Sequence, residues 1–151
     1  MTIRTESRTT IAGSVGDVWA YLCDVSCWPE WAPTVLECWV DGGAPLQPGS
    51  RVEQRARDLG WTHRRSEEVT AVEAPHSLAF AGPMGPSAAR WGMELEPIDD
   101  RQTDATMWIE VDLAGIMRAA PGLLRGSIQR VSDREMAAIK AAVEAPTRST
   151  L

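Results

Sequence analysis

Polar and apolar residues alternate from residue 2 to residue 12, at the start of the chain. Ile3, Thr5, Ser7, Thr9 and Ile11 share one face, while charged residues occupy the other. A period of two over this length is typical of a strand with one buried face. Three of these inward residues carry hydroxyl groups and are too polar for a dry core. We therefore expect this face to line a pocket, although the same residues would also fit a face that is partly solvated.

Two short helices are predicted after this strand. Ser14 can cap a helix over residues 15–23, because its side-chain oxygen can accept a hydrogen bond from a free N–H of the first turn. Pro29 suits the first turn of a second short helix over residues 28–32, and Pro33 ends it.

A series of strands then continues to residue 113. Breaker residues separate the strands, and residues 82–86, Gly-Pro-Met-Gly-Pro, form the most breaker-rich loop. Short links between consecutive strands predict an antiparallel meander. The expected strands are residues 34–40, 50–58, 61–73, 78–81, 88–96 and 103–113.

The spacing of apolar residues predicts one long C-terminal helix over residues 115–145. Pro121 is tolerated only in a first turn, so the regular helix should start near Ala119, with a separate turn before it. We expect residues 1–146 to form a single domain and residues 147–151 to be a loose tail. The predicted apolar stripe of the helix is Ile116, Ala120, Leu124, Ile128, Val131, Ala138 and Val143.

The aromatic composition is unusual, with seven Trp against one Tyr and one Phe. Trp is rarely buried completely, because its indole N–H needs a partner. The Trp residues therefore suggest amphipathic surfaces around a pocket, and simple core filling is the alternative.

The net charge of −6 argues against nucleic acid as a partner, because that affinity comes mainly from neutralising phosphates. It argues equally against an anionic membrane surface. The chain contains no run of 18 apolar residues that would span a bilayer. The N-terminus has no apolar core of a signal peptide, and we expect a cytoplasmic protein.

The chain has three cysteines, Cys23, Cys27 and Cys38, which we expect to be free thiols in a reducing compartment. Their spacing fits no zinc pattern, and only His63 and His76 could complete such a site. No nucleophile elbow, phosphate loop or dinucleotide motif occurs, so we expect neither a metal nor a cofactor.

Several segments resemble the START-like polyketide cyclase/dehydrase family of the helix-grip (Bet v 1-like) superfamily. Asp17-Val18-Trp19 followed by Trp28-Pro29-Glu30-Trp31 looks like one signature of that family. Residues 46–52, 69–80 and 134–144 are similar to others, so the resemblance covers nearly the whole chain. It implies an α+β helix-grip fold, in which a seven-stranded curved antiparallel sheet wraps around the long C-terminal helix. It also implies a cavity for a hydrophobic small molecule between the sheet and that helix.

The strand over residues 61–73 contains the candidate chemistry. Trp61, His63 and Arg65 share one face by the period of two, and aromatase/cyclases of the family carry a Trp, a small polar residue and an Arg at this spacing. The resemblance therefore implies a stacking wall at Trp61 and a cation at Arg65 for a carbonyl or enolate oxygen. His63 replaces a hydroxyl residue and is our candidate proton shuttle, because His titrates near neutral pH.

An ordinary solvent-facing strand would carry the same residues, with cross-strand pairs among Arg64, Arg65, Glu67 and Glu68. A bulge would shift the register and turn Arg64 inward instead.

Other side chains are candidates for ligand contact on the same grounds. Trp28 and Trp31 follow the short helices, where the family places the cavity mouth, and a packed corner is the alternative. Trp91, Met93 and Met107 fit either the cavity wall or plain core. Trp39 and Trp108 could be exposed or form a homodimer contact. The further predicted ligand-binding residues are Gln54, Trp91, Met93, Met107, Leu124 and Ile128.

Three functions fit the sequence. The first is a cofactor-independent cyclase, aromatase or dehydratase acting on a polyketide-like or other hydrophobic natural-product intermediate. The second is a non-catalytic binder or carrier of a hydrophobic small molecule. The third is an interaction module with a collapsed cavity and exposed Trp residues. Convergence of polar side chains on one point of the pocket would favour the first over the second.

Overall fold

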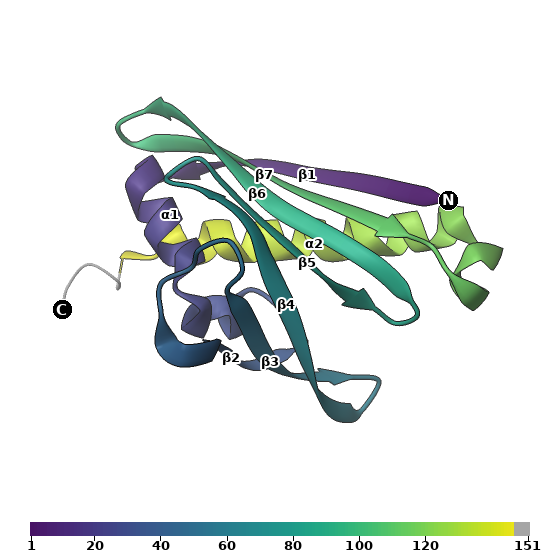
Figure 1. Ribbon diagram of the computed structural model, residues 1–151. Coiled ribbons are helices and arrows are strands. Elements are labelled where there is room, and N and C mark those ends of the chain that lie inside the picture. Colours follow the sequence, from purple (N-terminus) through teal and green to yellow (C-terminus); the bar gives the residue numbers. More distant parts are fainter. Residues whose placement is uncertain (147–151) are drawn as a thin grey trace.

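The computed structural model describes residues 1–146, so the predicted tail, 147–151, lies outside the described residues. Within residues 1–146, seven strands form one antiparallel sheet in the order β1-β7-β6-β5-β4-β3-β2 (Figure 1). The strands are β1 (Thr2–Ala12), β2 (Val35–Val40), β3 (Arg51–Asp58), β4 (Trp61–Glu73), β5 (Ser77–Met84), β6 (Ser87–Asp99) and β7 (Gln102–Asp112). Because β7 returns to pair with β1, the meander ends beside the first strand of the chain.

The helices pack on one side of this sheet. Helix α1 (Val15–Cys23) and the 3₁₀ helix η1 (Val25–Glu30) follow β1, and a short 3₁₀ turn η2 (Asp41–Gly43) follows β2. The turn η3 (Gly115–Ala119) precedes the long helix α2 (Pro121–Glu144), which runs beneath the sheet in Figure 1. The predicted helix-grip fold, with its curved sheet and long C-terminal helix, is confirmed.

The two most regular strands match their sequence patterns. Strand β1 buries Ile3, Thr5, Ser7 and Ile11 and exposes the charged residues between them. Strand β4 spans residues 61–73 as predicted and joins β3 through a two-residue turn. Alternating burial explains the first, because β1 presents every second side chain to the core, whereas β4 buries only Val69 completely.

The β5–β6 hairpin is longer than the sequence suggested. Strand β5 continues through Gly82 and Pro83 to Met84, so the expected five-residue loop is reduced to a tight turn. Pairing of β5 with β4 ends at Ala81. Beyond that point β5 pairs on one side only, where a proline without a backbone N–H is tolerated.

The predicted second short helix and the helical stripe also need correction. Helix η1 begins at Val25 rather than at residue 28 and ends before Trp31. In α2 the buried residues are Ile128, Ser132, Met136 and Ile139. Ile116, Ala120 and Val131, all assigned to the stripe, are exposed. The stripe was misplaced because it was traced through η3, which does not continue the helical repeat of α2.

One edge of α2 is fixed to β1 by polar contacts. Ser7 Oγ donates to Asp133 Oδ1 at 2.6 Å, and Lys140 Nζ donates to the Thr10 carbonyl at 2.7 Å. The backbone N–H of Ala12 donates to Glu144 Oε2 at 2.7 Å. The opposite edge of the helix therefore faces the other half of the sheet.

Among residues 1–146, no helix is long and apolar enough to cross a bilayer.

Candidate functional site

Four aromatic rings meet on the side of the sheet that faces the helices. The Trp28 ring of η1 lies 5.6 Å from Trp31, 5.2 Å from Phe80 and 5.4 Å from Trp91, measured between centroids. Phe80 and Trp91 stack at 4.4 Å. The Trp28 indole donates to the Leu22 carbonyl at 3.0 Å, which fixes the ring. Three predicted wall residues, Trp28, Trp31 and Trp91, are therefore brought together.

Arg65 extends from β4 towards the same side. Its Nε donates to Gln54 Oε1 on β3 at 2.8 Å, and its Nη2 donates to Thr34 Oγ1 at 3.2 Å. Gln54 is 2% exposed, so this guanidinium is held against the interior. Arg65 and Gln54 are direct partners across the two strands. The irregularity of β4 lies after Val69, too far along the strand to turn Arg64 inward.

Glu67 joins Arg65 and Gln54 in one polar cluster. Gln54 Nε2 donates to Glu67 Oε2 at 3.1 Å, so the Gln54 amide links the carboxylate to the guanidinium. Burial raises the pKa of Glu67, and the charge of Arg65, followed by the N–H groups of Trp91 and Gln54, opposes part of that rise.

Glu135 reaches this cluster from α2. It follows Ser132 by three residues and precedes Ile139 by four, which places it on the inward face of the helix. Burial raises the pKa of Glu135 to about 7; the charge of Arg65 opposes the rise and that of Glu67 adds to it. Two carboxyl groups and one guanidinium thus share the space between β4 and α2.

Cys38 of β2 lies close to the same charges. Burial raises the pKa of its thiol to about 12, the charge of Glu67 adds to the rise and that of Arg65 opposes it. A thiol with this pKa is protonated at neutral pH and is a poor nucleophile.

The other residues predicted on β4 lie nearer its open end. His63 is about half exposed, and its Nε2 lies 3.3 Å from Asp58 Oδ2. The same Asp58 oxygen lies 3.7 Å from Arg65 Nη1, so one carboxylate connects the two predicted catalytic residues. Trp61 is 78% exposed at the hairpin and is not part of the aromatic cluster. Arg64 points outward and lies over the Trp39 ring at 5.5 Å.

The remaining predicted ligand contacts lie in packed regions. Met93 and Met107 are each 2% exposed in the main core. Ile128 belongs to a second apolar cluster beneath β7, against which the partly buried Leu124 packs. Trp108 lies on the outer face, with Arg4 over its ring at 5.2 Å.

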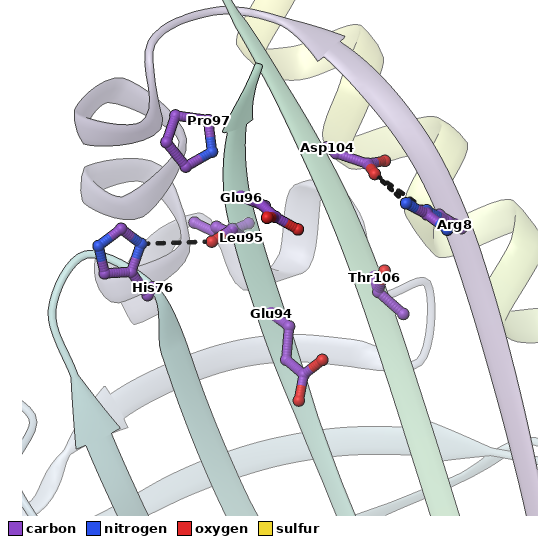
Figure 2. Close-up of a pocket in the computed structure, with 8 residues that line it drawn as sticks. All are labelled: Arg8, His76, Glu94, Leu95, Glu96, Pro97, Asp104 and Thr106. Carbon is purple, nitrogen blue, oxygen red and sulfur yellow. Dashed lines mark hydrogen bonds and ion pairs between the residues drawn. The ribbon is translucent and has the colours of Figure 1, made fainter. Parts of the chain in front are cut away.

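Two hollows lie on the outer face of the sheet rather than beneath the helix. Figure 2 shows the first, a space of about 430 Å³ between β1, β6, β7 and the turn before β5. An ion pair between Arg8 and Asp104 forms one wall, and His76 faces the Leu95 carbonyl on the other. The second hollow, about 590 Å³, runs along β4, β5 and β6. Both are open, and the polar cluster of Arg65, Gln54 and Glu67 is on the opposite side.

Glu67 and Glu135 were missed as site residues by the sequence analysis. Glu67 follows Arg65 by two residues and so shares its face, but the charge run around it was read as a possible solvated surface. Glu135 lies at helical spacing from Ile128, a signal hidden by the misplaced stripe. Within residues 1–146, no three His, Cys, Asp or Glu side chains come together as metal ligands.

The comparisons with known proteins agree with this architecture. Among solved structures, the Zhui aromatase/cyclase from Streptomyces sp. R1128 is similar, with a TM-score of 0.78 and 15% identity, over 99% of this chain and 98% of that one. A protein of unknown function, SA2116 from Staphylococcus aureus, is similar with a TM-score of 0.80 and 9% identity, over 99% of this chain and 98% of that one. The di-domain ARO/CYC StfQ from the steffimycin biosynthetic pathway gives 0.75 at 16% identity, over 100% of this chain and 53% of that one.

These identities are low enough that the likenesses show the fold alone. No curated protein matches the sequence. The model of the family described as polyketide cyclase / dehydrase and lipid transport matches residues 2–144. That match covers nearly the whole chain, and the protein belongs to this family.

Proposed function

We propose that this protein is a cofactor-independent cyclase, aromatase or dehydratase for a polyketide-like or other hydrophobic natural-product intermediate. The observation that carries the proposal is the convergence of Gln54, Arg65 and Glu67 beside the aromatic cluster. A carrier needs apolar walls and scattered polar groups. A linked cation and carboxylate on the inner side of the sheet are what acid/base chemistry requires.

Arg65 has the properties of an oxyanion partner. Cyclisation of a poly-β-ketone and dehydration of a β-hydroxy ketone both pass through an enolate. Its oxygen must be stabilised as negative charge develops. Gln54 and Thr34 hold two of the guanidinium nitrogens, and the group has further N–H donors for a substrate oxygen.

The aromatic cluster supplies the wall against which such a substrate would fold. Trp91 and Ile109 face the helices and remain only partly buried, so part of their surface stays accessible to a ligand. Flat rings beside a charged group favour a ligand with an extended conjugated or ketone-rich chain.

His63 is the proposed proton shuttle at the open end of β4. Asp58 contacts both His63 and Arg65, so it can orient the imidazole relative to the guanidinium. A proton taken up by His63 would pass directly to solvent, because the ring is half exposed.

The test compares adjacent residues of one strand. The probe is a β-hydroxy ketone with a phenyl group next to the hydroxyl, whose dehydration gives an enone followed by ultraviolet absorbance. We expect Arg65→Ala to lower turnover by about a hundredfold or more. Arg64→Ala, which alters the outward neighbour, should leave turnover unchanged. His63→Ala tests the shuttle in the same assay.

Ligand binding is followed separately through quenching of Trp fluorescence. Full turnover in Arg65→Ala would refute the role of this residue. Quenching of the wild-type protein by the probe without any turnover would favour the carrier instead.

A further inference from the structure

Glu135 is a partly buried carboxyl on the inward face of α2. Within residues 1–146 its carboxyl makes no hydrogen bond and no ion pair, although Asp133, Lys140 and Glu144 of the same helix all bond to neighbours. Partial removal of a carboxyl group from water without hydrogen bonds costs free energy. A ligand with a polar group would supply the missing partner.

Glu135 lies on the side of α2 that is close to the proposed site. The edge of α2 that bonds to β1 carries Asp133, Lys140 and Glu144, whereas Glu135 lies on the other side of the buried stripe. Arg65 and Glu67 of β4 are near enough for their charges to act on it. A molecule held by Arg65 between the sheet and α2 would therefore lie close to Glu135 as well.

We propose that Glu135 is a catalytic residue that removes a proton from the carbon next to the substrate carbonyl and returns it later in the reaction. This inference rests on the proposed function, and it adds Glu135 as the group that transfers the proton inside the site, while His63 exchanges protons with solvent at the open end of β4. Arg65 holds the carbonyl oxygen while Glu135 acts on the neighbouring carbon.

The steps balance without another reactant. The Glu135 carboxylate takes the proton, the C–H electron pair forms the enolate C=C bond, and Arg65 stabilises the oxygen. In a dehydration the enolate re-forms the carbonyl, the β C–O bond breaks, and the leaving hydroxyl takes the proton from Glu135 as water. In a cyclisation the enolate carbon attacks a second carbonyl, and the new alkoxide takes the same proton.

The charges around Glu135 suit a carboxyl group that both accepts and donates a proton. Burial and the charge of Glu67 raise the pKa of Glu135 to about 7, although Arg65 opposes the rise. A pKa near the working pH allows one carboxyl to act first as a base and then as an acid. Glu67 is held beside Glu135 by the hydrogen bond from Gln54.

Other titratable groups around α2 are engaged elsewhere. On α1 and η1, the Tyr21 hydroxyl donates to Glu30 Oε1 at 3.1 Å. On β2, the Cys38 thiol has a pKa of about 12 and stays protonated. The pH response of Glu135 is therefore set by Arg65 and Glu67.

The first experiment measures proton exchange rather than product. The wild-type chain is incubated in D₂O with a simple aromatic β-diketone, and loss of the proton between the carbonyls is followed by NMR. We expect Glu135→Gln to slow exchange by about a hundredfold or more. Glu68→Gln, an exposed carboxyl beside Glu67, is the matched control and should have no effect. An unchanged rate in Glu135→Gln overturns the proposal.

The second experiment needs no substrate. Carbon-13 NMR of labelled glutamate carboxyls should show one resonance that titrates near pH 7. It should be absent in Glu135→Gln and should move to lower pH in Glu67→Gln, which removes the neighbouring negative charge. A Glu135 resonance that titrates in the ordinary range of about 4–5 refutes the proposal even if the protein is an enzyme.

The two proposals fail differently. Exchange that depends on Glu135 but yields no enone or cyclised product would remove the proposed function and keep the proton-transfer role. Turnover that survives in Glu135→Gln but is lost in His63→Ala would keep the function and overturn the inference. A wild-type chain that catalyses neither exchange nor turnover overturns both.

Discussion

Replacing Glu135 by Gln should stabilise the protein at alkaline pH. The raised pKa means that the folded protein holds the Glu135 proton more tightly than the unfolded chain does. Below the unfolded value of 4.5 the carboxyl is neutral in both states and costs little. Between pH 4.5 and about 7 the unfolded chain ionises it and the folded protein does not, so stability falls over that range and levels off above it.

The size of this effect follows from the shift. A change from 4.5 to about 7 corresponds to about 3 kcal/mol, at about 1.36 kcal/mol for each pKa unit. Gln has nearly the same shape and never ionises, so Glu135→Gln avoids the cost. We expect the variant and the wild type to be equally stable near pH 4. The variant should be more stable by about 2–3 kcal/mol near pH 8.

Urea unfolding of both proteins, followed by Trp fluorescence from pH 4 to pH 8, tests this expectation. Several carboxylates whose pKa is lowered, such as Asp104 beside Arg8, add stability as the pH rises out of the acid range. These groups are present in both proteins, so the difference between the two curves isolates Glu135. A difference that does not change with pH, or a variant that is less stable at pH 8, would show that Glu135 is not held neutral by burial.

Three further substitutions test how local sequence holds the fold. Gly92→Ala should destabilise by about 1–3 kcal/mol in thermal unfolding, because a Cβ would lie 2.7 Å from the Trp108 ring. Leu59→Asn should stabilise by about 0.5–1 kcal/mol, since Leu59 has a φ of 49° in a turn and is 98% exposed. Ser14→Ala should cost about 1 kcal/mol by removing the cap on the Asp17 N–H, and urea unfolding measures both of the last two.

Much of the fold could be predicted because the alternation of side chains is long and regular. Breaker residues also helped: β4 lies between Leu59-Gly60 and Ala74-Pro75, so both of its ends were predicted correctly. The separate turn before α2 followed from Pro121, which is tolerated only where no helical N–H is required.

The errors have local physical causes. The end of β5 was misjudged because Gly82 and Pro83 are breakers in a fully paired strand, and the sequence does not reveal that β5 is paired on one side there. The stripe of α2 was misplaced because Ile116 is apolar but exposed. Which apolar residues are buried depends on the packing of η3 and α2 against the sheet.

Only part of the site, Arg65 but not Glu135, could be predicted from the sequence, for a related reason. Arg65 could be assigned to the inner face from its period and from the family resemblance, and the continuous pairing of β3 with β4 places it there. Glu135 comes from a segment 70 residues away along the chain, and its helical spacing from the buried Ile128 was hidden by the misplaced stripe. Only the folded chain brings it close to Arg65.

The folding free energy that Glu135 costs is itself an argument for its proposed role in proton transfer. Arg65 and Glu67 recover part of their desolvation through Gln54, which bonds to both. Glu135 has no such bond within residues 1–146 and its charge is repelled by Glu67. A protein selected only for stability would gain by replacing it with Gln or Leu, as the alkaline unfolding experiment is designed to show. Retaining a destabilising carboxyl beside a fixed cation is understandable if activity depends on it, because active sites commonly trade stability for reactivity.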